Sequence, residues 1–218
     1  LEIRGKTGAF VRLTEFSKPA DQGPKTLEAI ANRNCSWFYY SKPDDFLRIP
    51  GSPIAYWITE KAINSFSGRQ VGNLTISDGQ NKTGDNARFV RLWWEVSYVN
   101  FGGGKKWLSY AKGGDFRRWF GNLDYVIDWS DAARNHYQKD FSARIIPEYL
   151  YYRIGVTWTL LTSAKQSFRL LPKYATFDMT GSSLFLKDKR DVNVLVSYLN
   201  SCVADMFMKI LNPTFALQ

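Results

Sequence analysis

Hydrophobic and polar positions follow two different periods along this chain. Between residues 88 and 98 they alternate, which is the period of a strand with one buried face. The glycines at 102–104 follow, so the pattern predicts a hairpin from this strand to a second strand at 107–110. The sequence predicts further strands at 10–13, 125–129, 156–161 and 176–179.

Helical spacing marks other segments. A helix is predicted at 21–32, and a second at 58–66 with Thr59 near its cap. Ser130 is the expected N-cap of a third helix, whose apolar stripe would be Ala133, Tyr137 and Phe141. Together the elements predict an α+β fold: a mixed, mostly antiparallel twisted sheet with flanking helices and a long C-terminal amphipathic helix over 192–210, which Asn212-Pro213 ends.

The composition adds a strong positive charge to this picture. Among 218 residues, 29 Lys and Arg face 20 Asp and Glu, for a net charge of +9, and aromatic residues make up 16%. Hydrophobic residues make up 44%, which excludes a disordered tail and is enough for a core. A folded domain this basic typically binds a polyanion, and nucleic acid is the first candidate. Charge alone leaves open the alternative of a merely soluble basic surface.

The two cysteines, Cys35 and Cys202, are expected to be reduced thiols in a cytoplasmic protein, with Cys202 a small buried hydrophobe. The sequence shows no secretory signal pattern, and its longest strongly apolar stretch is too short to span a bilayer. We interpret Leu1 and Gln218 as cut points in a longer chain.

The residue patterns that common catalytic sites need are incomplete in this sequence. His136 is the single histidine, and no acidic residue stands two positions before a lysine, as a restriction-type nuclease core requires. The string from Phe101 has Lys105 where a methyltransferase cofactor loop needs glycine. Asn212–Phe215 resembles the Asn-Pro-Pro-Tyr loop of N6-adenine methyltransferases, but Thr214 replaces the second proline. We therefore predict no catalytic, cofactor-binding or metal site in this fragment.

Basic residues instead cluster beside glycines and aromatic residues. Glycine lets the backbone approach a phosphate closely, Arg and Lys supply the charge, and Asn can read adenine. About half of these cations, ~6, are expected to touch DNA, and the others are solvated charges. The candidates for DNA binding on this ground are Lys82, Asn86, Arg88, Arg91, Lys105, Lys106, Lys112, Arg117, Arg118, Lys165, Arg169 and Lys173.

Several strings, in order and spacing, resemble a family. Over nearly the whole chain, the sequence resembles the part after the catalytic domain in PglX-like adenine-specific DNA methyltransferases of BREX phage-defence systems. Related type IIG restriction–modification enzymes share much of this pattern. The strings that carry the resemblance lie at 10–14, 49–57, 83–96, 112–122, 155–159, 181–183, 199–201 and 211–214.

The resemblance implies a division of the chain. Residues 1–76 would be a connector that follows a methyltransferase domain absent from this chain, and 77–218 a target-recognition domain similar to the TaqI specificity domain. The string that includes Thr83 and Arg88 would open the recognition domain, and Gly113 and Gly114 would belong to its second string. Asp85 would orient Arg88 or cap a turn.

The resemblance also implies a function. We expect sequence-specific binding of double-stranded DNA by a segment that has no turnover alone. S-adenosylmethionine would be the cofactor of the parent protein, and the parent's own methyltransferase domain and other defence-system subunits would be partners. The alternative is a protein-interaction or scaffolding module that docks other defence-system subunits, in which the charge serves steering.

Overall fold

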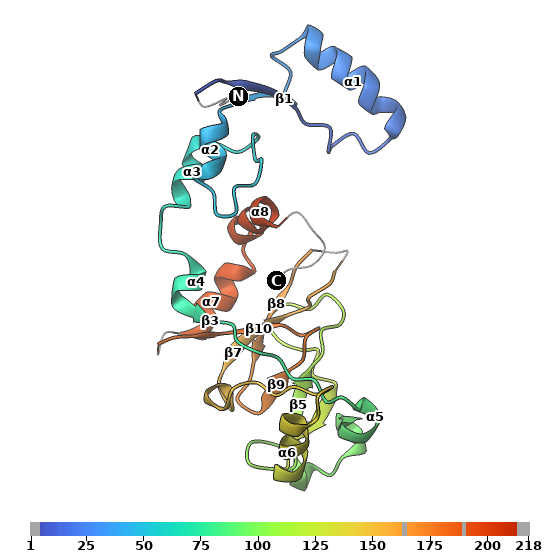
Figure 1. The fold of residues 1–218 in the computed structure, drawn as a ribbon. Coiled ribbons are helices and arrows are strands. Elements are labelled where there is room, and N and C mark those ends of the chain that lie inside the picture. Colours follow the sequence, from blue (N-terminus) through green and yellow to red (C-terminus); the bar gives the residue numbers. More distant parts are fainter. Residues whose placement is uncertain (1–4, 163–164, 189–190, 213–218) are drawn as a thin grey trace. The chain divides into compact units, whose positions relative to one another are not determined.

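The computed structural model describes residues 5–162, 165–188 and 191–212 (Figure 1). The chain divides into two compact units, Leu1–Gln70 and Val71–Gln218, called here the first and the second unit. Helices and strands are mixed in both, so the predicted α+β class is confirmed.

The first unit is built on a two-stranded antiparallel sheet of β1 (Gly8–Val11) and β2 (Phe38–Ser41). Its helices include α1 (Pro19–Ala31), α2 (Pro43–Leu47) and α3 (Glu60–Ser65). The predicted strand at 10–13 and the predicted helices at 21–32 and 58–66 are therefore confirmed to within a few residues.

Aromatic packing and a side-chain cap stabilise this first unit. The ring of Phe10 stacks on Tyr56 at 4.6 Å and meets the edge of Phe46 at 5.9 Å. Thr59 caps α3, because its hydroxyl accepts the N–H of Ala62 at 3.3 Å. The predicted cap at Thr59 is confirmed.

The described part of the second unit contains two four-stranded sheets. In the first, named the β8 sheet, the order is β3-β10-β7-β8 and every neighbouring pair is antiparallel. Its strands are β3 (Thr75–Ile76), β10 (Ser183–Leu186), β7 (Gly155–Trp158) and β8 (Phe168–Leu171). Strand β8 is an edge strand of this sheet.

The second sheet, named the β5 sheet, has the order β4-β6-β5-β9. Its strands are β4 (Val90–Leu92), β6 (Tyr125–Asp128), β5 (Trp107–Ala111) and β9 (Ala175–Phe177). The pairs β4–β6 and β6–β5 are antiparallel, whereas β5–β9 is parallel. The predicted strands at 107–110, 125–129, 156–161 and 176–179 are confirmed in place, with shifted ends.

The two sheets of the second unit share one hydrophobic core. Leu171 and Phe185 of the β8 sheet pack with Tyr110, Ile127 and Phe177 of the β5 sheet, and each of these side chains is at most 2% exposed. Burying side chains of this size stabilises the fold by roughly 1.5–3 kcal/mol each. The shared core therefore fixes the loops of the two sheets relative to one another.

Further helices surround the sheets: α4 (Val71–Leu74), α5 (Asn86–Phe89) and α6 (Asp131–Lys139). The short 3-10 helix η3 (Glu148–Leu150) follows α6. Ser130 caps α6 by accepting the N–H of Ala133 at 3.3 Å, as predicted.

Two sequence-based expectations about side chains in this unit are wrong. Phe141 was expected on the apolar stripe of α6, but the helix ends at Lys139 and the side chain is fully exposed. Cys202 was expected to be buried, but it lies exposed at the start of the last helix.

The predicted long strand over 88–98 is also wrong, because the strand there is only β4, three residues long. Asp85 caps α5 by accepting the N–H of Arg88, and Glu95 accepts the N–H of Leu92 at 2.7 Å. Such local side-chain bonds compete with a sheet ladder. The 3-10 helices η1 (Trp93–Glu95) and η2 (Tyr98–Asn100) follow β4. The predicted hairpin is wrong as well, since β6 lies between β4 and β5.

The predicted long C-terminal helix is two helices, α7 (Val192–Leu199) and α8 (Cys202–Leu211), bent by 67°. At the break, the Asn200 amide donates to the Phe168 carbonyl at 2.8 Å and accepts the Phe168 N–H at 3.1 Å. Ser201 then caps α8. The side chain of Asn200 therefore pairs with β8 and stops the helix there.

Helix α8 ends at Leu211, before the predicted stop at Asn212-Pro213, and residues 213–215 of that string lie outside the described residues. In the described part of the chain, no single helix is long and apolar enough to cross a membrane. The bent pair α7–α8 passes that test by length and composition only, and α7 packs its apolar face on β7 and β8.

Candidate nucleic-acid interface

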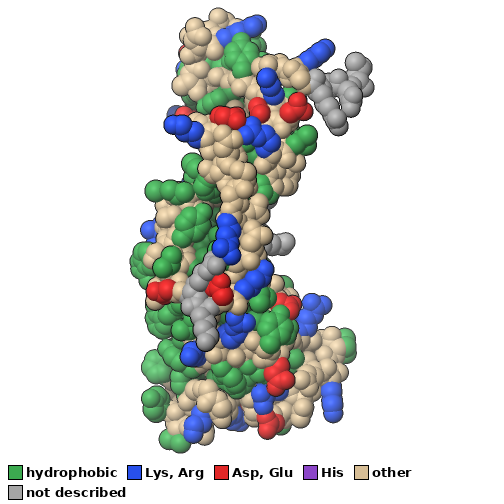
Figure 2. Space-filling model, turned by 90° about the vertical axis from the view of Figure 1, so that its left-hand side faces the viewer, with side chains coloured by type: hydrophobic (Ala, Val, Ile, Leu, Met, Phe, Trp, Pro, Cys, Tyr) green, Lys and Arg blue, Asp and Glu red, His purple; other side chains and the backbone are tan. Residues whose placement is uncertain are grey.

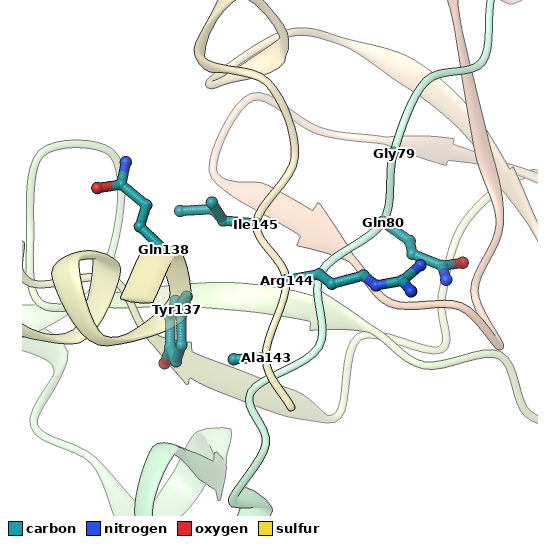
Figure 3. Close-up of a pocket in the computed structure, with 7 residues that line it drawn as sticks. All are labelled: Gly79, Gln80, Tyr137, Gln138, Ala143, Arg144 and Ile145. Carbon is teal, nitrogen blue, oxygen red and sulfur yellow. The ribbon is translucent and has the colours of Figure 1, made fainter. Parts of the chain in front are cut away.

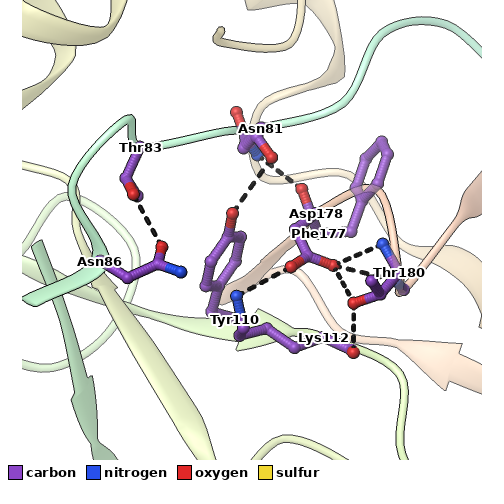
Figure 4. A network of polar contacts seen from close by, with 9 residues as sticks. Asn81, Thr83, Asn86, Tyr110, Lys112, Phe177, Asp178 and Thr180 are labelled. Atoms are coloured by element: carbon purple, nitrogen blue, oxygen red, sulfur yellow. Dashed lines mark hydrogen bonds and ion pairs between the residues drawn. The ribbon is translucent and has the colours of Figure 1, made fainter. Parts of the chain in front are cut away.

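A buried polar network ties the string at 83–96, called here the first string, to the β5 sheet through Asn81, which stands two positions before it (Figure 4). Asn81 is 1% exposed, and its amide donates to the Phe177 carbonyl at 3.0 Å and to the Thr176 hydroxyl. Its Oδ1 accepts the N–H of Ile146 at 3.0 Å. The Tyr110 hydroxyl donates to the Asn81 carbonyl at 3.1 Å, and burial raises the pKa of this phenol. Both polar atoms of the Asn81 side chain are therefore engaged in hydrogen bonds that stabilise the fold.

Asp178 continues the network to the string at 112–122, called here the second string. One carboxylate oxygen accepts the N–H groups of Thr180 at 2.8 Å and Gly181 at 3.0 Å, and the other pairs with Lys112 Nζ at 2.9 Å. The Thr180 hydroxyl donates to the Lys112 carbonyl. Figure 4 shows the resulting chain of contacts, in which segments distant in sequence converge around Tyr110. Lys112, the first residue of the second string, is thus held at its backbone carbonyl by Thr180 and at its ammonium group by Asp178.

Several polar groups of the first string bind one another, although most of its residues are exposed. Thr83 is 2% exposed, and its hydroxyl donates to Asn86 Oδ1 at 2.7 Å. Of the two roles expected for Asp85, the structure shows the cap, since its carboxylate accepts the Arg88 N–H at 3.0 Å. The exposed Arg88 guanidinium lies 4.7 Å from the centre of the Phe89 ring.

Arg91, at the middle of β4, is half-buried. Its guanidinium donates to the carbonyls of Ala87 at 2.6 Å and Val90 at 2.7 Å. Together with Asn86, Lys112 and other residues it lines a shallow cleft beside β4, so the structure brings members of the two strings to one place.

The second string forms a closed loop, named here the aromatic loop and comprising residues 113–122. Gly113 has φ +75°, and a Cβ there would meet the Thr180 carbonyl at 2.7 Å, so only glycine fits. The Gly114 carbonyl accepts the Thr159 hydroxyl at 3.0 Å, and the Asn122 amide donates to the Asp115 carbonyl at 2.9 Å. The first bond ties the start of the loop to Thr159, and the second holds the two ends of the loop together.

The aromatic loop carries exposed rings and cations. Phe116 is 51% exposed, Trp119 54% and Phe120 53%. Arg117 is exposed, and the guanidinium of the half-buried Arg118 lies 5.4 Å from the centre of the Phe116 ring. Large rings exposed beside guanidinium groups form a surface suited to stacking and to phosphate contact.

Arg169 lies inside the molecule beside this loop and is only 1% exposed. Its guanidinium donates to the Arg117 carbonyl at 3.4 Å and to the Thr159 hydroxyl at 3.3 Å. Burial, and to a lesser degree the charge of Arg117, lowers its pKa to about 10. With no exposed surface of its own, Arg169 acts on the loop and not on solvent.

The other candidates are spread along the second unit. Lys82, Lys105 and Lys173 are exposed, Lys106 Nζ lies 3.5 Å from Asp128, and Lys165 Nζ lies 3.4 Å from Asp205. On the face that Figure 2 shows, Lys and Arg side chains stand among hydrophobic ones, with acidic side chains scattered between them. The structure therefore does not bring all predicted cations into one patch.

Sequence reasoning missed Arg144. The backbone groups of Lys82 and Arg144 exchange two hydrogen bonds, at 2.9 and 2.7 Å, so the exposed Arg144 is a neighbour of the first string. Figure 3 shows Gln80 and Arg144 pointing to the same side of a shallow pocket, away from Gln138. Arg144 has no adjacent glycine or regular pattern, so no local signal marked it.

Comparison with known proteins places the chain among relatives. No family model matches it. Over 230 aligned residues it is 31% identical to the adenine-specific methyltransferase PglX of Lacticaseibacillus casei (strain Zhang), covering 98% of this chain and 19% of that protein. The resemblance to PglX-like proteins is confirmed. The PglX-like chain is also 31% identical, over 220 residues, to the adenine-specific methyltransferase BrxX of Escherichia coli O9:H4 (strain HS), covering 97% of this chain and 18% of that protein.

The PglX-like chain spans about a fifth of the length of these curated relatives. The aligned region includes both candidate strings, because it covers nearly the whole chain. The activity in the relatives' names belongs to proteins about five times longer than this one.

Proposed function

We propose that this chain is the target-recognition segment of an N6-adenine DNA methyltransferase from a phage-defence or restriction–modification system. It binds double-stranded DNA and has no turnover alone. Residues 77–218 form the recognition domain, similar to the TaqI specificity domain, and residues 1–76 connect it to the methyltransferase domain. The observation that carries the proposal is the aromatic loop, closed at its ends and bearing Arg117, Arg118 and three exposed rings.

The arrangement of charges supports this proposal. Phosphate contacts need cations at fixed places, and the aromatic loop holds Arg117 and Arg118 on a backbone tied at Gly114 and Asn122. The unit that carries them belongs to a chain with a net charge of +9. The first string contributes Arg88, and Lys82 and Arg144 lie beside it. DNA binding by these groups would weaken steeply with salt.

The glycine string from Phe101 does not fit a cofactor loop for S-adenosylmethionine. The glycine string that sequence comparison offered for it folds as a turn, in which Gly102 donates to the Trp107 carbonyl at 2.9 Å and Lys105 donates to the Gly102 carbonyl at 3.0 Å. An exposed lysine side chain stands where a cofactor loop needs glycine. We therefore assign the cofactor to the methyltransferase domain of the parent protein, which is this segment's proposed partner together with other defence-system subunits.

A titration of duplex DNA at several salt concentrations tests the proposal. We expect binding whose logarithm falls linearly with the logarithm of salt, and a slope smaller by up to about 2 in the double variant Arg117→Ala, Arg118→Ala. The double variant Lys139→Ala, Lys209→Ala removes the same charge from exposed helix positions and serves as the control. Absence of duplex binding at low salt, or equal slopes in the two double variants, contradicts the proposal.

One observation favours a second candidate function, docking of another protein segment. Between residues 93 and 99 four large apolar side chains are exposed: Trp93 at 56%, Trp94 at 58%, Tyr98 at 88% and Val99 at 73%. This segment contains Glu95 but no lysine or arginine. An apolar patch without cations suits a protein partner better than a polyanion. If Trp94→Ala with Tyr98→Ala weakens association with the parent's other domain and leaves DNA affinity unchanged, docking is supported.

A further inference from the structure

Trp119 combines exposure with an unusual backbone. Its φ is +75°, in the left-handed region that bulky side chains rarely adopt. More than half of its side chain is exposed, so burial of the indole does not explain why the backbone is held there. In the described part of the chain, no ring contact involves this indole. Conformations of this kind persist where the surrounding structure holds them and cluster at binding sites.

The surrounding structure does hold Trp119. Its N–H donates to the Phe168 carbonyl at 3.1 Å, and its carbonyl accepts the Leu170 N–H at 2.8 Å. These bonds make a bridge to the edge strand β8 on both sides of Arg169. Arg169 also binds the Arg117 carbonyl from inside. The indole is therefore mounted on a sheet edge, not on a free loop.

The neighbours of Trp119 suit a nucleic-acid backbone around a base. Arg117 is exposed two positions before it, and its side chain packs along Gly121, where a Cβ would lie 3.0 Å from Arg117 Cδ. Phe120 presents a second exposed ring. An exposed ring on a fixed backbone, with cations beside it, is an arrangement by which proteins stack on bases while holding phosphates.

We propose that Trp119 enters the base stack of the bound duplex, while Arg117 and Arg118 contact the flanking phosphates. This inference rests on the proposed function and adds to it the residue that disturbs the stack. The left-handed backbone aims the ring outward, and Arg169 acts as a positioning residue beneath it. The inserted ring of Trp119 is called here the wedge. Opening a duplex costs less where a base is already missing or mismatched, so a wedge predicts tighter binding to such sites.

The experiment compares the affinity of the chain for an intact duplex and for the same duplex with one abasic site. Wild type is expected to prefer the abasic duplex by about tenfold, since stacking of a ring on one base is worth that order of affinity. Trp119→Ala should lose the preference, and Trp119→Phe should retain most of it. The salt slope should stay unchanged in both variants, because the cations remain.

Two controls separate the wedge from a loss of folding and from the proposed function. Trp119→Gly relaxes the left-handed backbone, so its unfolding temperature should match or exceed that of Trp119→Ala, while the abasic preference is still lost. Trp94→Ala removes an equally exposed indole elsewhere and should keep the preference. An abasic preference that survives in Trp119→Ala overturns the wedge alone. No duplex binding by wild type overturns both the wedge and the proposed function.

Discussion

The two candidate strings of the second unit use similar residue types in opposite ways. Around the start of the first string the buried side chains are Asn81 and Thr83, each at most 2% exposed, and Asp85 caps a helix, whereas Asn86 is exposed. The aromatic loop turns its side chains outward, with Trp119 and Arg117 exposed on a backbone tied to β8. A polar residue whose hydrogen bonds are all made inside the fold has none left for a ligand. The start of the first string therefore stabilises the fold of the second unit, whereas the aromatic loop forms an exposed surface.

The largest expected effect is the loss of the buried amide. Asn81→Ala leaves the Ile146 N–H and the Thr176 hydroxyl without a partner in the core, so we expect it to lower the free energy of unfolding by about 3 kcal/mol. Urea unfolding followed by tryptophan fluorescence measures this. Asn86→Ala, at an exposed position of the first string, should cost under about 1 kcal/mol. Equal losses in the two variants would show that the start of the string does not stabilise the fold.

A pair of glycines tests how closely the start of the aromatic loop packs on the backbone at Thr180. Gly113 and Gly104 have nearly the same φ, +75° and +74°, but a Cβ at Gly113 would meet the Thr180 carbonyl at 2.7 Å, whereas nothing lies within 4 Å at Gly104. We expect Gly104→Ala to cost about 1 kcal/mol for the backbone alone, and Gly113→Ala about 2 kcal/mol or more. Thermal unfolding compares them. If Gly113→Ala is no worse than Gly104→Ala, the contact between Gly113 and Thr180 is unimportant.

High pH should lower the free energy of unfolding, because the phenol of Tyr110 then loses its proton. Burial, followed by the charge of Asp178, raises the pKa of this phenol above its ordinary value of 10.0, so the folded protein keeps the proton longer than the unfolded chain. The stability that the neutral phenol contributes is complete below pH 10 and is lost as pH rises further, by about 1.4 kcal/mol per pH unit.

Unfolding measured between pH 9 and 11 checks this dependence. Tyr137, whose pKa burial also raises, contributes in the same direction, and Arg169, whose pKa is lowered, contributes in the opposite one. Tyr110→Phe removes one of these groups, so its stability should fall less steeply above pH 10. A variant with the same slope as wild type would mean that Tyr110 does not carry the effect.

The smallest effect on stability is expected for Arg169→Met, which should nevertheless weaken duplex binding. Arg169→Met replaces a buried cation by an apolar side chain, so stability should change by no more than about 1 kcal/mol. The loop then loses the bond to the Arg117 carbonyl, and duplex affinity should fall by about threefold although Arg169 has no exposed surface. The same titration as above measures it. Unchanged affinity would show that the loop is positioned without Arg169.

Local signals determined much of the fold from the sequence alone. The caps at Thr59 and Ser130 and the strands β5 and β6 follow from residues within a few positions of each other, where side chains and backbone interact directly. The resemblance to PglX-like proteins was likewise visible in the sequence, and the comparisons confirm it. The same local reasoning found the cations of the aromatic loop, Arg117 and Arg118.

Only the tertiary structure decided which residues are partners over long distances. β6 lies between β4 and β5, β9 pairs with β5 in parallel, and Asn200 binds β8 and divides the last helix in two. Likewise, Arg169 is buried beneath a loop that lies some fifty positions earlier, at Arg117. These pairings depend on burial and on hydrogen bonds between segments that share no local pattern. The sequence therefore determines which side-chain groups are present, and the packed fold determines which of them are buried and which are exposed.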